Sequence, residues 1–303
     1  MRQEQLKELS WQTSSELFPL QKKRLQLIWV SQPSISALTY IVILGVDSTL
    51  DLSGTQADGI MGMSPRVYSN DNEELYVQKL FEAGRISKNQ FGVSYKSTSG
   101  TSKIMIGGYD TSIVPNDTSF AYVDLFSTGH WTLELKKTWY GGEELNLESG
   151  TGILDTGTSL TYFPTDDFNI IWGKITSGKT WGWTESGFRA CYCSAASDFE
   201  DIKFRFGDYI IDFPASSFIE FTNVSGGQNV WEFYIDDIDL SSWGSPFLLL
   251  GDSFLRNYYI LHDVTNLRVG FFGTFSEDTS LATSTGAFSV ASCLVVLLFL
   301  SGI

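Results

Sequence analysis

The residues with the clearest chemical potential lie at 152–164, which read G-I-L-D-T-G-T-S-L-T-Y-F-P. Asp155 follows two apolar residues typical of a buried strand, and Gly157 can make the tight turn that must come next. Hydroxyl side chains on Thr156 and Thr158 flank that glycine. A carboxylate in such a turn can be held in one hydrogen-bonded pose, as acid–base catalysis requires. The pattern favours a catalytic role for Asp155 over an ordinary β-turn that happens to contain D-T-G.

The composition limits the partners of the chain. Its 303 residues include 35 acidic and 20 basic side chains, so the formal net charge is −15, and 43% of the residues are hydrophobic. Such a charge argues against nucleic acid or an anionic membrane surface as a partner. It is compatible with an acidic compartment, where carboxylates titrate and their repulsion fades. Solubility alone would explain the charge equally well, while the apolar content is enough for a large core.

The cysteines and histidines do not form a pattern typical of metal sites. Cys191 and Cys193 are separated by one residue, which does not suit zinc without further ligands and is awkward for a mutual disulfide. Cys293 lies in an apolar tail. The only histidines, His130 and His262, stand in different contexts, and I-L-H-D around His262 reads as a strand. We therefore expect neither a metal site nor a Ser-His-Asp triad.

The D-T-G segment resembles the second catalytic motif of the pepsin-like aspartic endopeptidases, peptidase family A1. Other segments resemble further motifs of that family, in the same order. They are residues 57–63 (A-D-G-I-M-G-M), 81–91 (F-E-A-G-R-I-S-K-N-Q-F), 106–110 (I-G-G-Y-D), 130–133 (H-W-T-L), 249–256 (L-L-G-D-S-F-L-R) and 258–272. The resemblance thus covers most of the chain between residues 57 and 272.

This resemblance implies a mainly β, pepsin-like acid protease fold with a complete C-terminal lobe and the back part of the N-terminal lobe. Residues 1–30 match nothing in the family. Residues 31–128 would be the remnant of the N-terminal lobe with the inter-lobe bridge, and residues 129–273 the catalytic C-terminal lobe. Residues 274–303 would be a polar linker and an apolar tail.

The family mechanism implies a role for each residue of the turn. Two aspartates share one proton, and the ionised one takes a proton from the water that attacks the peptide carbonyl. Asp155 would be one of the pair. Thr156 would make inter-lobe hydrogen bonds, Gly157 would allow tight packing, and Thr158 would hydrogen-bond the Asp155 carboxylate. The implied substrate is a peptide or protein, the chain is expected to be a monomer, and no metal or organic cofactor is required.

Two family features have no match in the sequence: the first D-T/S-G motif and the flap tyrosine. The nearest candidate, Asp47, is followed by S-T, and threonine fits poorly where glycine belongs. We therefore expect an N-terminally truncated aspartic protease sequence that contains one of the two catalytic aspartates. Such a chain should have no activity of its own. The alternatives are a non-catalytic protein that binds peptides or a partner, and an arrangement in which two chains each supply one aspartate.

The C-terminal tail predicts attachment to a membrane. Residues 274–286 are rich in Ser, Thr, Ala and Gly, and residues 287–303 are uncharged and apolar. This layout favours a GPI-attachment signal over a tail-anchoring helix or a buried segment. Asn116 and Asn223 begin N-glycosylation sequons. Together these features predict passage through the secretory pathway to the cell surface or to an acidic, lysosome-like compartment.

Local patterns also predict particular elements. Pro164 followed by two aspartates indicates a helix from residue 164 to about residue 176. Alternating residues on either side of G-D at 207–208 predict a hairpin of residues 202–206 and 209–213.

Overall fold

The structure, a computed structural model, describes residues 61–65, 75–95, 102–225, 228–240 and 243–278, together with the backbone of two strands at residues 9–10 and 24–29. Three features considered above lie outside the described residues. They are Asp47, residues 57–60 of the first resembling motif, and the apolar tail at residues 287–303.

Strands dominate the described part of the chain, as the sequence predicts. They are β1 (Leu9–Ser10), β2 (Arg24–Trp29), β3 (Gln90–Ser94), β4 (Ser102–Ile106), β5 (Ala121–Ser127), β6 (Thr132–Tyr140), β7 (Glu143–Leu145), β8 (Thr151–Leu154), β9 (Thr161–Pro164), β10 (Trp181–Trp183), β11 (Arg189–Tyr192), β12 (Ile202–Phe206), β13 (Tyr209–Phe213), β14 (Ile219–Ser225), β15 (Gln228–Phe233), β16 (Ile235–Ile238), β17 (Leu248–Leu250), β18 (Tyr259–Asp263), β19 (Arg268–Phe272) and β20 (Phe275–Glu277). The helices are α1 (Tyr76–Glu82), α2 (Thr165–Ile175), α3 (Ala215–Phe218) and α4 (Asp252–Leu255), with 3-10 turns η1 (Asp117–Ser119) and η2 (Ala196–Asp198).

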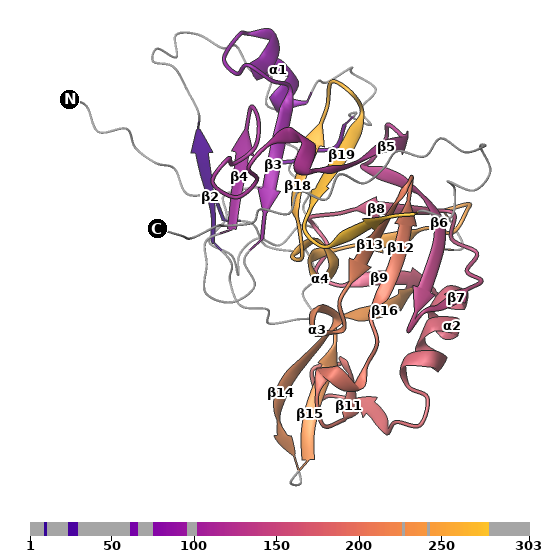
Figure 1. Ribbon diagram of the computed structural model, residues 1–303. Coiled ribbons are helices and arrows are strands. Elements are labelled where there is room, and N and C mark those ends of the chain that lie inside the picture. Colours follow the sequence, from indigo (N-terminus) through magenta and orange to yellow (C-terminus); the bar gives the residue numbers. More distant parts are fainter. Residues whose placement is uncertain are drawn as a thin grey trace, which may run out of the picture.

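One large sheet of sixteen strands runs through the described residues. Its main path has the order β1-β2-β4-β3-β18-β19-β5-β6-β8-β17-β9-β16, with β7, β12, β13 and β20 attached beside it (Figure 1). The domain boundary that we expect between residues 128 and 129 falls in the turn between β5 and β6. Because β5 pairs with β6, the strands on the two sides of that boundary share one sheet.

The sheet is covered on both faces where β3 and β18 meet. Every residue of these two strands is buried, which is typical of strands in the interior of a protein. Val77 and Leu80 of α1 belong to the same apolar cluster as Phe91 of β3. This part of the molecule therefore forms a rigid support for the side chains that β3 and β18 present to the candidate site.

The predicted hairpin and helix are both confirmed. The strands β12 and β13 pair from Ile202↔Phe213 to Phe206↔Tyr209, and Gly207 turns between them with a φ of 57°. The left-handed backbone there favours glycine. The helix α2 begins directly after Pro164 and turns its apolar face inward.

Two features of the structure were not expected from the sequence. Cys191 and Cys193 form a disulfide. The Cα atoms of the two cysteines lie 5.4 Å apart, within the range that a disulfide spans. The polar linker expected from residue 274 begins instead with the strand β20, which pairs with β13 and packs Phe275 against Tyr209.

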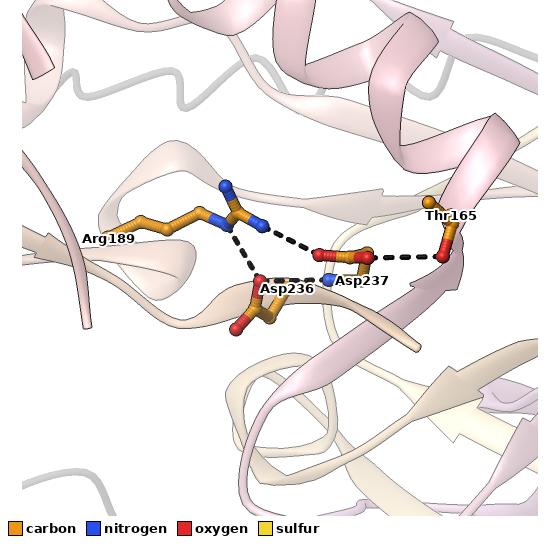
Figure 2. A network of polar contacts seen from close by, with 4 residues as sticks. All are labelled: Thr165, Arg189, Asp236 and Asp237. Carbon is orange, nitrogen blue, oxygen red and sulfur yellow. Dashed lines mark hydrogen bonds and ion pairs between the residues drawn. The ribbon is translucent and has the colours of Figure 1, made fainter. Parts of the chain in front are cut away.

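A second, four-stranded sheet, β10-β11-β15-β14, is tied to the large sheet by Arg189 of β11 (Figure 2). Its guanidinium pairs with Asp236 at 2.7 Å and with Asp237 at 2.6 Å, and Asp237 also accepts a hydrogen bond from Thr165. Four rings surround the guanidinium: Phe168, Trp172, Trp181 and Trp183. Because β16, which carries both aspartates, pairs with β9, the network fixes the strand that follows the Asp155 turn.

Candidate active site

Asp155 lies where β8 leaves the sheet. The strand β8 runs between β6 and β17, and Leu154 is the register partner of Leu250 on the parallel strand β17. The backbone N–H of Asp155 donates to the carbonyl oxygen of Leu250 at 3.0 Å. The sheet therefore sets the backbone position of Asp155, as the apolar residues before it predict.

The turn itself holds the carboxylate. The N–H of Gly157 donates to Oδ1 of Asp155 at 2.9 Å, and the hydroxyl of Thr158 donates to Oδ2 at 2.5 Å. A Cβ on residue 157 would lie 3.1 Å from Oδ1, so a larger residue would crowd this hydrogen bond. The Asp155 side chain remains partly exposed. A fixed carboxylate that solvent can still reach is suited to take a proton from a water molecule.

Thr156 contacts a residue that is distant from the turn in the sequence. It is exposed, and its side chain hydrogen-bonds the side chain of Tyr95. Tyr95 belongs to the expected N-terminal-lobe remnant, but this contact is between side chains; the inter-lobe bonds from the Thr156 hydroxyl to backbone that the resemblance implies stay a prediction. The Tyr95 contact joins the turn to the end of β3.

A second loop, at the end of β17, is hydrogen-bonded to the Asp155 turn. The N–H of Asp252 donates to the carbonyl oxygen of Thr158 at 2.8 Å, and the N–H of Ser253 donates to that of Ser159 at 3.1 Å. Gly251 precedes this loop, and its Cα lies against the carbonyl oxygen of Thr158. The loops after β8 and β17 are therefore packed backbone against backbone.

A cavity of about 550 Å³ opens beside Asp155. Most of its wall is apolar, with aromatic side chains from several strands and loops; among them are Phe91, Trp131, Trp243 and Phe247. Met63, from the end of the D-G-I-x-G resemblance, lines the cavity, and its carbonyl oxygen accepts the Trp131 indole N–H at 2.8 Å. An apolar hollow with a few polar groups is typical of a ligand site.

His262 lines the same cavity and is almost completely buried, at 2% exposure. Its ring stacks on Phe91 with centroids 4.3 Å apart and meets Trp131 edge-on at 4.6 Å. Burial lowers the pKa of His262 from its ordinary value of 6.5 to about 3, although a hydrogen bond to the backbone of Phe91 acts in the opposite direction. The imidazole is therefore neutral at physiological pH, as expected for a strand residue in the core.

Reading the sequence did not find three polar residues of this site: Tyr95, Asp252 and the cavity-lining His262. Asp252 carries a usable signal, because L-L-G-D repeats the arrangement of an acidic residue directly after an apolar strand. Tyr95 carries none, since its place beside Asp155 depends on the register of β3. His130 lines the cavity as well, on its exposed rim.

The two candidate glycosylation residues lie away from the cavity, on exposed surface. Asn116 precedes η1, where its side-chain oxygen accepts a hydrogen bond from Thr118 at 2.6 Å. Asn223 lies on β14 and is exposed. Over the part of the chain that the structure describes, no group of three or more His, Cys, Asp or Glu side chains is placed to hold a metal ion.

The fold and the turn together define the class of protein. A family model described as eukaryotic aspartyl protease matches residues 40–273, which include most strands of the large sheet, the Asp155 turn and the loop at Gly251. The chain belongs to the eukaryotic aspartyl protease family, and its mainly β structure is the pepsin-like fold.

Curated relatives agree with this assignment. Pepsin F of Oryctolagus cuniculus is 31% identical over 218 residues, which are 70% of this chain and 53% of that protein. The aspartic protease of Phaffia rhodozyma is 27% identical over 72% of this chain and 52% of its own length. Gastricsin of Homo sapiens is 27% identical, with 71% and 54% covered. The chain thus spans about half the length of the curated relatives it matches.

Proposed function

We propose that this chain supplies one of the two catalytic aspartates of an aspartic endopeptidase that hydrolyses peptide bonds at acid pH. The observation that carries the proposal is the Asp155 carboxylate, held by Gly157 and Thr158 at the mouth of an apolar cavity. Asp155 would accept a proton from the attacking water and pass it to the leaving nitrogen, while a second aspartate polarises the carbonyl. The apolar wall would bind side chains of the peptide.

A second candidate function is the binding of peptides or of a partner without catalysis. It is favoured by the sequence, which contains a single D-T-G motif. One carboxylate cannot be both base and acid in the same step, but a cavity lined by aromatic side chains can still hold a peptide. Both proposals place the peptide beside Asp155 as a ligand of a monomeric chain.

The experiment that tests the first proposal is an acid-peptidase assay on the natural gene product and on its Asp155→Asn variant. Asparagine keeps the shape of the side chain but cannot accept the proton. We expect cleavage by the natural product and a loss of about a thousandfold or more in the variant. Equal activity of the two proteins would exclude Asp155 from the chemistry, and binding without cleavage by either would favour the second candidate.

We also propose that the protein passes through the secretory pathway as a glycoprotein and is held at a membrane by a GPI anchor that replaces its apolar C-terminal segment. Among the described residues no helix is long and apolar enough to cross a membrane, and residues 287–303 lie outside that part of the chain. The proposal rests on the apolar block at the C-terminus and on the exposed sequons at Asn116 and Asn223.

Treatment of intact cells with a phosphatidylinositol-specific phospholipase is expected to release a glycosylated protein that lacks residues 287–303. The lipase cuts only a GPI anchor, whereas a tail-anchoring helix would remain in the bilayer. Protein that stays with the membrane, with its C-terminal peptide still found by mass spectrometry, would contradict the GPI anchor. Absence of sugar on both asparagines would contradict secretory passage.

A further inference from the structure

Tyr95 brings a phenol to the catalytic turn from a distant part of the chain. It directly follows β3, packs against the main core and lines the same cavity as Asp155 and Asp252. Its side chain hydrogen-bonds that of Thr156, the residue between the catalytic carboxylate and Gly157. Tyr95, Asp155, Thr156 and Asp252 are thus among the polar residues of a mostly apolar cavity wall.

The Tyr95 phenol is protonated at neutral and acid pH. Burial, and then the negative charge of Asp252, raise the pKa of Tyr95 well above its ordinary range, and the charge of Asp155 acts in the same direction. The hydrogen bond from Thr156 acts against them, as expected when the Thr156 hydroxyl donates to the phenol oxygen. With its oxygen engaged in this way, Tyr95 has its own O–H left to donate.

We propose that Tyr95 is a further substrate-binding residue of this site, whose hydroxyl donates a hydrogen bond to the carbonyl oxygen of the peptide bound beside Asp155. The inference rests on the proposed function, because it needs a peptide in the cavity. Two observations carry it: Tyr95 lines the same cavity as Asp155 and Asp252, and its side chain hydrogen-bonds that of Thr156.

The donor has a defined chemical effect. A neutral hydroxyl that points at a carbonyl oxygen stabilises the negative charge that develops there when water attacks the carbon. The Tyr95 proton is not transferred in this step; the proton of the attacking water goes to Asp155, and the Tyr95 hydrogen bond only becomes stronger. The phenol would therefore orient and polarise the carbonyl, whichever group supplies the second acid.

The test is a double-mutant cycle. It removes the Tyr95 hydroxyl from the protein and the central carbonyl oxygen from the peptide, singly and together. The ligands are an acetylated apolar hexapeptide with two central phenylalanines and the same peptide with its central amide replaced by an (E)-alkene, which has no carbonyl oxygen. The proteins are the full chain and its Tyr95→Phe variant, and binding is followed by tryptophan fluorescence, since Trp131 and Trp243 line the cavity. Tyr259→Phe is the matched control, because its hydroxyl accepts the N–H of Asp110 and does not line the cavity.

We expect the full chain and the Tyr259→Phe control to bind the amide about tenfold more tightly than the alkene, and Tyr95→Phe to bind both equally. If the role of Tyr95 is purely structural, the Tyr95→Phe variant will bind both ligands more weakly but will keep the tenfold preference for the amide. That result would overturn the assignment of Tyr95 and leave the peptide site itself intact. Failure of the full chain to bind either peptide would overturn both this assignment and the peptide site on which it depends.

Discussion

Replacement of Gly251 by alanine is expected to abolish the native fold. An alanine Cβ at this position would lie 2.2 Å from the carbonyl oxygen of Leu160 and 2.4 Å from that of Thr158. Both contacts are with backbone atoms of the loop that follows Asp155, so no side chain can rotate away to make room. The chain must either move the Asp155 turn or unfold, and we expect a loss of more than about 4 kcal/mol in the free energy of unfolding.

Chemical denaturation measures this effect, with Gly173→Ala as the matched control. Gly173 lies on the exposed face of α2, and a Cβ there would meet no atom within 4 Å. Alanine favours a helix over glycine by roughly 0.5–1 kcal/mol, so the control should be slightly more stable than the natural chain. A Gly251→Ala protein within about 1 kcal/mol of the natural chain would show that the packing of the two loops is wrong.

Replacement of His262 by phenylalanine is expected to protect the protein against acid. The folded protein keeps His262 neutral down to about pH 3, whereas the unfolded chain binds a proton below pH 6.5. Above pH 6.5 the histidine contributes no pH dependence. Between pH 6.5 and about 3 it costs the folded state about 1.4 kcal/mol for each unit of pH, and below that range the cost is constant. Phenylalanine removes this cost and keeps the ring between Phe91 and Trp131.

Unfolding at pH 7 and at pH 4 measures the difference. The stability gained in the His262→Phe variant should be about 3 kcal/mol larger at pH 4 than at pH 7. Phe91→Leu is the control, because it alters the packing against the His262 ring without adding or removing a titratable group. It should change the free energy of unfolding equally at both pH values. A gain for His262→Phe that does not depend on pH would mean that the imidazole is not held neutral in the fold.

Much of this architecture follows from local sequence patterns. The Asp155 turn, the hairpin of β12 and β13, and the helix α2 each depend on residues that are neighbours in the chain, so apolar spacing, glycine and proline were enough to predict them. The hydrogen bond between Thr158 and Asp155 was expected from the family resemblance, and the structure contains it.

The residues that were missed depend on long-range pairing. Tyr95 lies sixty residues before Asp155, and the two meet only because of the way β3 joins the sheet through β18. The pairing of β3 with β18 also places His262 opposite Phe91, its register partner. Both residues line the cavity together with Trp131. No local pattern reports such a pairing.

The claim that Asp155 is one half of a catalytic pair is tested most directly by a cleavage assay on the isolated 303-residue chain. An unfolded protein substrate is incubated with the purified monomer at acid pH, beside the Asp155→Asn variant and with and without pepstatin. Because one carboxylate cannot serve as both base and acid, we predict no cleavage above that of the variant. Cleavage that is proportional to monomer concentration, blocked by pepstatin and lost in Asp155→Asn would contradict this account.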